Sequence, residues 1–326
     1  MKLSVIIPVY NTGHLVKNAI YSLKQSKVEC EIICINDGSK DDSLDKLNKL
    51  KQEFTDLIIF DKSNEGLSAT RNYGILKATG DYLFFLDSDD MVEPAAFKQL
   101  VDLCTDNVDI IHANFVYTYE NSQNRKNNKE QLEFEGAGQT FINKSLLQDK
   151  LSMLACINLY RKQFLIENKL FFTPGIYHED EEFNLRAFSF ANLIKSKNIM
   201  FYLYLQRHNS ITNDHQNLSK RFEDIIWIHR EIDKFLLTKS HIYDEYLKSC
   251  QTYISFMVIF AYCRVKDKLL KQKYLNEVKQ LKLFKKINSP ILMYRVSKYG
   301  IKFVPRLFLK TFSMLMGYRN KKFNID

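Results

Sequence analysis

The stretch FFLDSDD, residues 84–90, places three carboxylates within four positions directly after an apolar run. Like charges this close repel one another and raise one another's pKa unless a positive group lies among them. The Asp-x-Asp pattern of Asp87 and Asp89 suits Mg²⁺ or Mn²⁺, which takes few carboxylates while substrate phosphates complete its shell. The pattern therefore predicts a divalent cation and, with it, a phosphate-bearing ligand.

Strand and helix patterns alternate over the first 116 residues. Short apolar runs at 3–9, 31–36, 57–60, 82–86 and 108–116 are separated by helical patterns at 13–26, 41–54, 66–79 and 94–105. This order predicts an α/β fold with a mostly parallel sheet flanked by helices. Ligands bind at the carboxyl ends of such strands, so the Tyr10 ring, the Asp37 carboxylate and the DSDD cluster are expected around one ligand.

Composition and charge limit the possible functions. The chain has 326 residues, 45% apolar and 26% charged, with six cysteines and no CxxC pair. Its net charge of +9 comes from residues 279–326, which carry +11, so the rest does not resemble a nucleic-acid-binding body. No signal peptide pattern is visible, and the longest apolar runs, such as 253–263, are too short to span a bilayer. These features and the free thiols favour a cytoplasmic protein.

Five linked motifs resemble, in order and spacing, family 2 glycosyltransferases of the GT-A fold. They are VIIPVYN, INDGSKDDS, NEGLSATRNYGILKATGDYLFFLDSDD, IYHEDEEFNLRAF and, after a strand pattern, RHNSIT at 207–212. The nearest subgroup builds bacterial capsular, extracellular or cell-wall polysaccharides. The resemblance implies a nucleotide-sugar donor, Mn²⁺ or Mg²⁺, and inversion at the anomeric carbon. It covers roughly 1–215 as the GT-A nucleotide-sugar-binding and catalytic domain, and leaves 216–326 as a helical, basic C-terminal region.

The resemblance also implies roles for individual residues at the donor site. Pro8 and Tyr10 would line the nucleobase pocket, Asp37 would accept a hydrogen bond from uracil or ribose, and Arg71 with Asn72 would lie near base and ribose. A second group would surround the metal and the diphosphate: Asp87, Ser88, Asp89, Arg207, His208 and Ser210. Within it, Asp89 is expected to bind the metal directly, Asp87 to face the ribose or the metal, and the basic and hydroxyl groups of RHNSIT to reach the diphosphate. His208 is either a third metal or phosphate contact or a surface loop residue.

The catalytic pair implied by the resemblance is Glu179 with Asp180, and Asp180 is the expected base. An aspartate with a reference pKa of about 3.9 is ionised at neutral pH and can take the proton of the attacking hydroxyl. Asp180 lies near the start of a predicted helix, 179–190, whose dipole is expected to keep it ionised. Glu179 is expected to point elsewhere, because adjacent residues do not share a helix face.

Two other functions compete with this interpretation. A nucleotidyltransferase that makes activated sugars would carry a Gly-rich basic loop after the first strand, but PVYNTGHLV has only Gly13 and no basic residue before Lys17. An inactive sugar-nucleotide-binding subunit of a transferase complex is disfavoured by the intact Asp87, Asp89 and Asp180. Taken alone, DSDD could equally be a solvated turn. The glycosyltransferase interpretation therefore rests on the occurrence of all the motifs together.

The sequence also gives expectations about the donor, the acceptor and the location of the protein. Asp37 suits the uracil imide, so we expect a UDP-sugar and a hexosyl or N-acetylhexosaminyl transfer, with Asn114, Cys156 and Asn158 as candidates for the sugar pocket wall. A glycan or a lipid-linked sugar is the expected acceptor. In residues 290–318, five basic residues fall on one stripe of a helix beside apolar positions. This favours a helix on an anionic membrane, which would make the protein peripheral on the inner face of the cell membrane; the alternatives are a helix packed on the protein or at a homo-oligomer interface.

Overall fold

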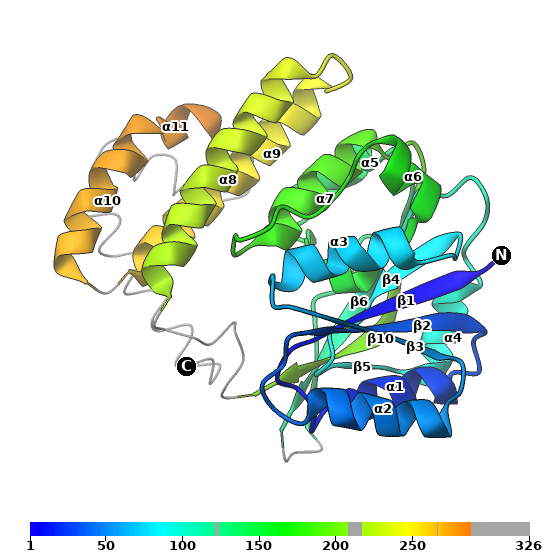
Figure 1. The fold of residues 1–326 in the computed structure, drawn as a ribbon. Helices are drawn as coiled ribbons and strands as arrows, with labels where there is room; N and C mark the ends of the chain where they lie inside the picture. Colours follow the sequence, from blue (N-terminus) through cyan, green and yellow to red (C-terminus); the bar gives the residue numbers. More distant parts are fainter. Residues whose placement is uncertain (121–123, 208–216, 266, 288–326) are drawn as a thin grey trace. The chain divides into compact units, whose positions relative to one another are not determined.

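The computed structural model describes residues 1–120, 124–207, 217–265 and 267–287, which divide into two compact units (Figure 1). The first unit contains residues 1–141, 150–175 and 179–207. The second contains 142–149, 176–178 and the chain from 208 onward. The domain boundary proposed from the sequence, at residue 215, lies outside the described residues.

Ten strands of the described residues form one mixed sheet in the first unit. Their order is β3-β2-β1-β4-β9-β6-β10-β5, with β7 paired to β6 and β8 to β10. The strands are β1 (Leu3–Val9), β2 (Cys30–Asp37), β3 (Leu57–Lys62), β4 (Tyr82–Phe85), β5 (Met91–Val92), β6 (Ile110–Tyr119), β7 (Arg125–Asn127), β8 (Phe134–Gly136), β9 (Asn158–Arg161) and β10 (Ile194–Gln206).

The parallel part of this sheet brings the predicted motifs to one edge. β3, β2, β1 and β4 pair in parallel, so their carboxyl ends lie on the same side. β9 then runs antiparallel between β4 and β6, and β10 is parallel to β6. Because β9 is antiparallel to both β4 and β6, strands β6 and β10 run in the same direction as β4. The carboxyl end of β10 therefore also lies at this edge. The sheet is therefore less parallel than the sequence predicted, but the edge that carries the motifs is the predicted one.

Helices cover both faces of the sheet (Figure 1). α1 (Val16–Gln25), α2 (Ser43–Glu53) and α4 (Pro94–Val101) lie on one face, and α3 (Leu67–Lys77) lies on the other. Alternate residues of β1 supply the two sides: Val5 and Ile7 join the core with α1, while Ile6 faces α3. Gly74 allows this approach, because a Cβ there would lie 2.4 Å from Ile6 Cγ2. α3 is thereby held against β1.

The remaining helical segments of the first unit lie along the chain between its last strands, β8, β9 and β10. They are a short 3₁₀ turn (Ala155–Ile157), α6 (Lys162–Glu167) and α7 (Glu179–Phe190), while α5 (Gly138–Leu147) runs from the first unit into the second. Phe172, before α7, stacks on Phe183 of α7 with ring centroids 4.0 Å apart. This aromatic contact fixes the start of α7 next to the segment that leads into it.

The described part of the second unit is helical. It contains α8 (Leu218–Thr238), α9 (Asp244–Arg264), α10 (Lys268–Gln280) and α11 (Leu283–Lys286). α8 and α9 lie side by side (Figure 1), with Ile225, Ile232, Ile254 and Val258 buried. None of the described helices has both the length and the apolar character needed to cross a membrane. The predicted membrane-surface helix, 290–318, lies outside the described residues.

Candidate active site

The four residues 87–90, which follow Leu86 beyond the end of β4, have different environments. Asp87 and Asp89 keep 27% and 22% of their side chains exposed at the sheet edge. Ser88 is buried and its Oγ shares a 2.8 Å hydrogen bond with Thr12 Oγ1. Asp90 is also buried and accepts hydrogen bonds from the Tyr202 hydroxyl (2.6 Å) and the Leu205 amide (2.7 Å). Only the first and third of these four residues therefore present carboxylates at the edge.

Arg71 lies at the centre of the site. Its side chain is 2% exposed, and its Nη2 donates to Asp87 Oδ1 at 2.9 Å. Its Nη1 donates to Asp180 Oδ1 at 2.8 Å and to Glu179 Oε1 at 3.1 Å. Arg71 was expected near base and ribose; in the structure its guanidinium is surrounded by three carboxylates. It is one of the positive groups that the acid cluster requires, and sequence spacing alone could not identify it.

Glu179 and Asp180 begin α7, as the sequence predicted. The expectation that Glu179 points elsewhere is wrong, because both carboxylates accept from the same guanidinium nitrogen. Both carboxylates lie in the first turn of α7, and the long side chain of Arg71 reaches between them. The second oxygen of Asp180 accepts from the Ala155 amide at 3.0 Å. This bond fixes the orientation of the carboxylate.

The expectation of an ordinary, low pKa for Asp180 is also wrong. The pKa of Asp180 is raised to about 7, because the effect of burial is only partly offset by the attraction of Arg71 and the nearby Glu179 charge acts in the same direction as burial. Burial likewise raises the pKa of Glu179. The dipole at the start of a helix does not by itself keep a carboxylate ionised when the residues around that carboxylate exclude water. A carboxyl with a pKa near neutrality is well matched to general base catalysis at pH 7.

Asp37 holds the loop that leads into α3. One oxygen accepts from Lys62 Nζ (2.5 Å) and the Glu65 amide (3.0 Å); the other accepts from the Gly66 amide (2.9 Å) and from Asn64 (3.3 Å). Burial alone would raise the pKa of Asp37, but these hydrogen bonds outweigh it and lower the pKa. All four positions at which the carboxylate readily accepts are thus occupied. A uracil could be bound by Asp37 only in exchange for one of these donors.

The other expected nucleotide residues differ in accessibility. Tyr10 follows β1 and is 43% exposed, so its ring is free to stack on a base, whereas Pro8 is buried within β1. Asn72 donates to the Phe172 carbonyl at 2.8 Å and accepts from the Phe172 amide at 2.8 Å. Asn72 therefore ties α3 to the segment before α7.

Arg207 follows β10 and pairs with Asp89. Its Nε and Nη2 lie 2.9 Å and 2.6 Å from Asp89 Oδ2. Burial and the Asp87 charge raise the pKa of Asp89, and Arg207 opposes this shift. His208 and Ser210 lie outside the described residues.

The carboxylates at this edge have suitable chemistry for a divalent cation. Within the parts of the chain that the structure describes, no group of three or more His, Cys, Asp or Glu side chains forms a ready-made metal site. Asp87 and Asp89 nevertheless offer partly exposed oxygens, and a cation that keeps several waters or phosphate oxygens needs only one or two carboxylates. The donor set therefore fits Mg²⁺ or Mn²⁺.

The three residues proposed for the sugar pocket wall lie in the core instead. Asn114, Cys156 and Asn158 are buried. Asn158 Oδ1 lies 2.7 Å from His112 Nδ1, and its amide donates to the Tyr160 hydroxyl at 2.9 Å. Strand-bound asparagines next to a binding edge cannot be distinguished from core hydrogen-bonding residues by sequence.

Comparison with solved structures shows the fold. The TarS 1–349 structure of S. aureus, in complex with UDP-GlcNAc, matches with a TM-score of 0.73 at 16% identity. The match covers 98% of this chain and 92% of that one. This likeness, over both units, identifies the expected GT-A type fold.

A family model identifies the family, and two sequence relatives are named as glycosyltransferases. The chain is 25% identical over 307 residues to the uncharacterised glycosyltransferase YibD of Escherichia coli, covering 90% of this chain and 89% of that one. It is 29% identical over 238 residues to a poly(ribitol-phosphate) beta-glucosyltransferase of Bacillus spizizenii, covering 69% of this chain and 36% of that one. The model of glycosyl transferase family 2 matches residues 4–168. With this match over half of its length, the chain belongs to glycosyltransferase family 2.

Proposed function

We propose that this glycosyltransferase moves a hexose or N-acetylhexosamine from a UDP-sugar to a hydroxyl of a glycan or lipid-linked acceptor, with inversion. The observation that carries the proposal is the bridge made by Arg71. It joins Asp87, at the end of β4, to Asp180, at the start of α7. Arg71 therefore holds two groups at one place in the first unit. Asp87 is suited to hold a metal and phosphate, and Asp180 is suited to take a proton.

The donor would bind along the carboxyl edge of the sheet. Tyr10 supplies an exposed ring for the base, with Pro8 behind it in β1. Asp37 would accept from uracil or ribose if Lys62, its one flexible charged donor, moves away. The UDP-GlcNAc complex of the structurally similar TarS supports a uridine nucleotide. Ser88 and Asn72 would act indirectly, by holding the surrounding loops.

The transfer is a single displacement at the anomeric carbon. The acceptor oxygen forms a bond to that carbon while the bond to the diphosphate oxygen breaks, and the hydroxyl proton passes to the Asp180 carboxylate. Asp89, with Asp87, would hold Mn²⁺ or Mg²⁺, which as a Lewis acid neutralises charge on the leaving diphosphate. Arg207 would turn from Asp89 to the diphosphate and stabilise the same charge. His208 and Ser210 remain proposed contacts of the metal or diphosphate.

A donor panel tests this function. The full-length protein is incubated with Mn²⁺ and UDP-, GDP- and dTDP-sugars, and the free nucleoside diphosphate is measured with and without candidate glycan acceptors. A transferase releases UDP from one or a few UDP-sugars, and the product has the opposite anomeric configuration. An inactive binding subunit would bind UDP-sugar without releasing UDP, and a retained anomer would contradict the inverting mechanism.

The proposed location rests on the basic C-terminal sequence. Residues 290–318 would bind an anionic membrane surface, placing the enzyme on the inner face of the cell membrane, where lipid-linked sugar acceptors are accessible. The catalytic part would be 1–215 and the helical, basic part 216–326. A homo-oligomer formed through the C-terminal segment is the alternative use of that segment.

A further inference from the structure

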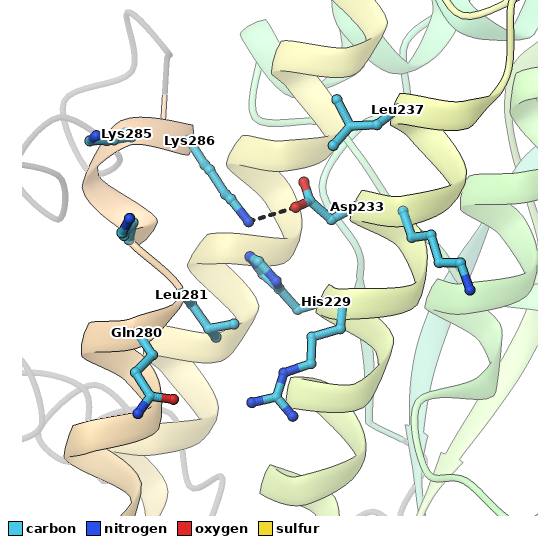
Figure 2. Close-up of a pocket in the computed structure, with 10 residues that line it drawn as sticks. His229, Asp233, Leu237, Gln280, Leu281, Lys285 and Lys286 are labelled. Atoms are coloured by element: carbon cyan, nitrogen blue, oxygen red, sulfur yellow. Dashed lines mark hydrogen bonds and ion pairs between the residues drawn. The ribbon is translucent and has the colours of Figure 1, made fainter.

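A pocket of about 470 Å³ lies among the helices of the second unit (Figure 2). One wall comes from α8 and the other from the end of α10 through α11. Most of its charged lining is basic: Arg230, Lys234, Lys282, Lys285 and Lys286. Asp233 is the acidic residue in this lining. The pocket therefore concentrates positive charge from two separate segments.

The acidic residue does not balance this charge. Asp233 Oδ2 accepts from Lys286 Nζ at 2.8 Å, an ion pair visible in Figure 2, and its Oδ1 accepts from Gln251 at 2.8 Å. Arg230 has Glu277 at 3.7 Å, near the surface. The ammonium groups of the other three lysines make no ion pair with a carboxylate of the described residues. The pocket thus carries an uncompensated positive field, which attracts anions.

His229 adds an unpaired hydrogen-bonding group to the same pocket. Its side chain is 1% exposed, and neither ring nitrogen has a hydrogen-bond partner within the described ranges. Burial, helped by the charges of Lys286 and Arg230 and opposed by Asp233, lowers the pKa of His229 to about 4. The imidazole is therefore neutral at pH 7, with one N–H donor. Buried donors are rarely left unpaired, and among these cations the natural partner is an anionic oxygen.

We propose that this pocket binds a phosphate group of a ligand. His229 donates to one phosphate oxygen, and Arg230 with the lysines neutralises the charge. A phosphate or diphosphate fits better than a single carboxylate, because it offers several acceptor oxygens and more than one negative charge to donors from both walls. The volume is within the range of ordinary ligand pockets. The proposal goes beyond the transferase activity and uses none of the donor-site residues.

Calorimetric titration of the full-length protein with inorganic pyrophosphate, in EDTA, tests the pocket. The pocket variant is Arg230→Gln/Lys285→Gln, and the matched control is Lys248→Gln/Lys279→Gln, which removes two exposed charges from α9 and α10 outside the lining. We expect the pocket variant to bind about tenfold or more weakly than the parent, and the control to bind as the parent does. Absence of binding by the parent, or equal weakening in both variants, overturns the proposal.

His229→Leu provides a second variant. It removes the unpaired polar group, so without pyrophosphate its Tm should equal or exceed that of the parent, while the rise in Tm on adding pyrophosphate should be smaller. An undiminished rise contradicts the role of His229. Binding to vesicles of phosphatidylglycerol distinguishes the source of the phosphate. If the pocket variant binds vesicles more weakly than the control variant does, the ligand is a lipid head group. If the pocket variant loses pyrophosphate binding but keeps vesicle binding, the ligand is a free phosphate compound.

Discussion

Arg71 and Asp180 form a buried ion pair in which Nη1 and Oδ1 lie 2.8 Å apart. The same guanidinium binds Asp87 through its other terminal nitrogen, so one side chain links the carboxylates proposed for metal binding and for proton transfer. The pair does not give Asp180 a low pKa, because burial raises that pKa to about 7 despite the cation. The ion pair with Arg71 therefore fixes the position of the proposed base, Asp180, whereas burial of the pair sets its affinity for a proton.

The pKa of Asp180 predicts the pH dependence of catalysis. Below about pH 7 the free enzyme carries the protonated, inactive acid, so kcat/KM should rise tenfold per pH unit and level off above that pKa. An aspartate with the reference pKa of about 3.9 would give a flat profile between pH 5 and 9. The profile should be measured at constant free Mn²⁺ with a saturating acceptor. A profile without a step near neutrality contradicts the assigned pKa.

Removal of Arg71 should destabilise the first unit. Arg71→Met leaves three partly buried carboxylates without their cation, and loss of one partner of a buried pair costs about 3–5 kcal/mol of unfolding free energy. Denaturant unfolding measures this loss. Arg71→Lys should recover part of the stability, because it restores the charge without the forked geometry.

The loss of stability in Arg71→Met should depend on pH. Without the cation the folded-state pKa values of Glu179 and Asp180 rise further above their unfolded values, and such groups lose stability as pH rises through the folded pKa. The deficit relative to the parent should therefore be larger at pH 8 than at pH 5. A deficit that is the same at both pH values would show that Arg71 contributes mainly through packing on Phe172.

Asp89 should be essential for metal-dependent donor binding. Asp89→Ala removes the proposed direct ligand, so transfer should fall by about 10²-fold or more, and Mn²⁺ should no longer strengthen UDP binding; Asp87→Ala should weaken both. Asp90→Asn is the matched control, since Asp90 is buried and its two oxygens already accept hydrogen bonds from Tyr202 and Leu205. UDP binding is titrated with defined free Mn²⁺. Parent-like rates in Asp89→Ala would remove Asp89 from the metal site.

The C-terminal segment should bind anionic membranes. Each basic residue contributes about 1 kcal/mol near an anionic surface, so five on one stripe with an apolar face should hold the protein on vesicles. Full-length protein should pellet with phosphatidylglycerol liposomes and be released by salt. Protein truncated after residue 288 should stay in the supernatant while still binding UDP-sugar. Equal pelleting of both proteins contradicts the membrane role of 290–318.

Local patterns predicted the elements and the edge of the sheet well. β1 spans 3–9 and α7 spans 179–190, as predicted, because a fully apolar run and an acidic helix start are local signals. The convergence of Tyr10, Asp37 and Asp87 at one edge follows from parallel pairing alone. β9 was missed because its four residues pair antiparallel between strands that are distant in sequence. β7 has the sequence RKN, three exposed polar residues that carry none of the apolar pattern of a strand.

The contacts within the site could not be predicted from the sequence. Nothing in the spacing of Arg71, Asp87 and Asp180 shows that one guanidinium binds both acids, because that contact depends on how α3 and α7 pack at the end of β4. The same holds for the four donors around Asp37. The pKa of Asp180 depends on burial, which a residue type and its neighbours do not report. Residue identities therefore indicated the chemistry, and tertiary packing determined the partners and proton affinities.

The central claim is that Asp180 takes the proton of the acceptor hydroxyl, and the Asp180→Asn variant tests it most directly. The amide preserves shape but cannot accept the proton, so the Kd for UDP-sugar with Mn²⁺ should remain that of the parent while kcat falls by about 10²–10⁴-fold. Glu179→Gln, one residue away on the same guanidinium, is the matched control and should lose less. Transfer by Asp180→Asn at the parent's rate, or a larger loss in Glu179→Gln, would contradict the account.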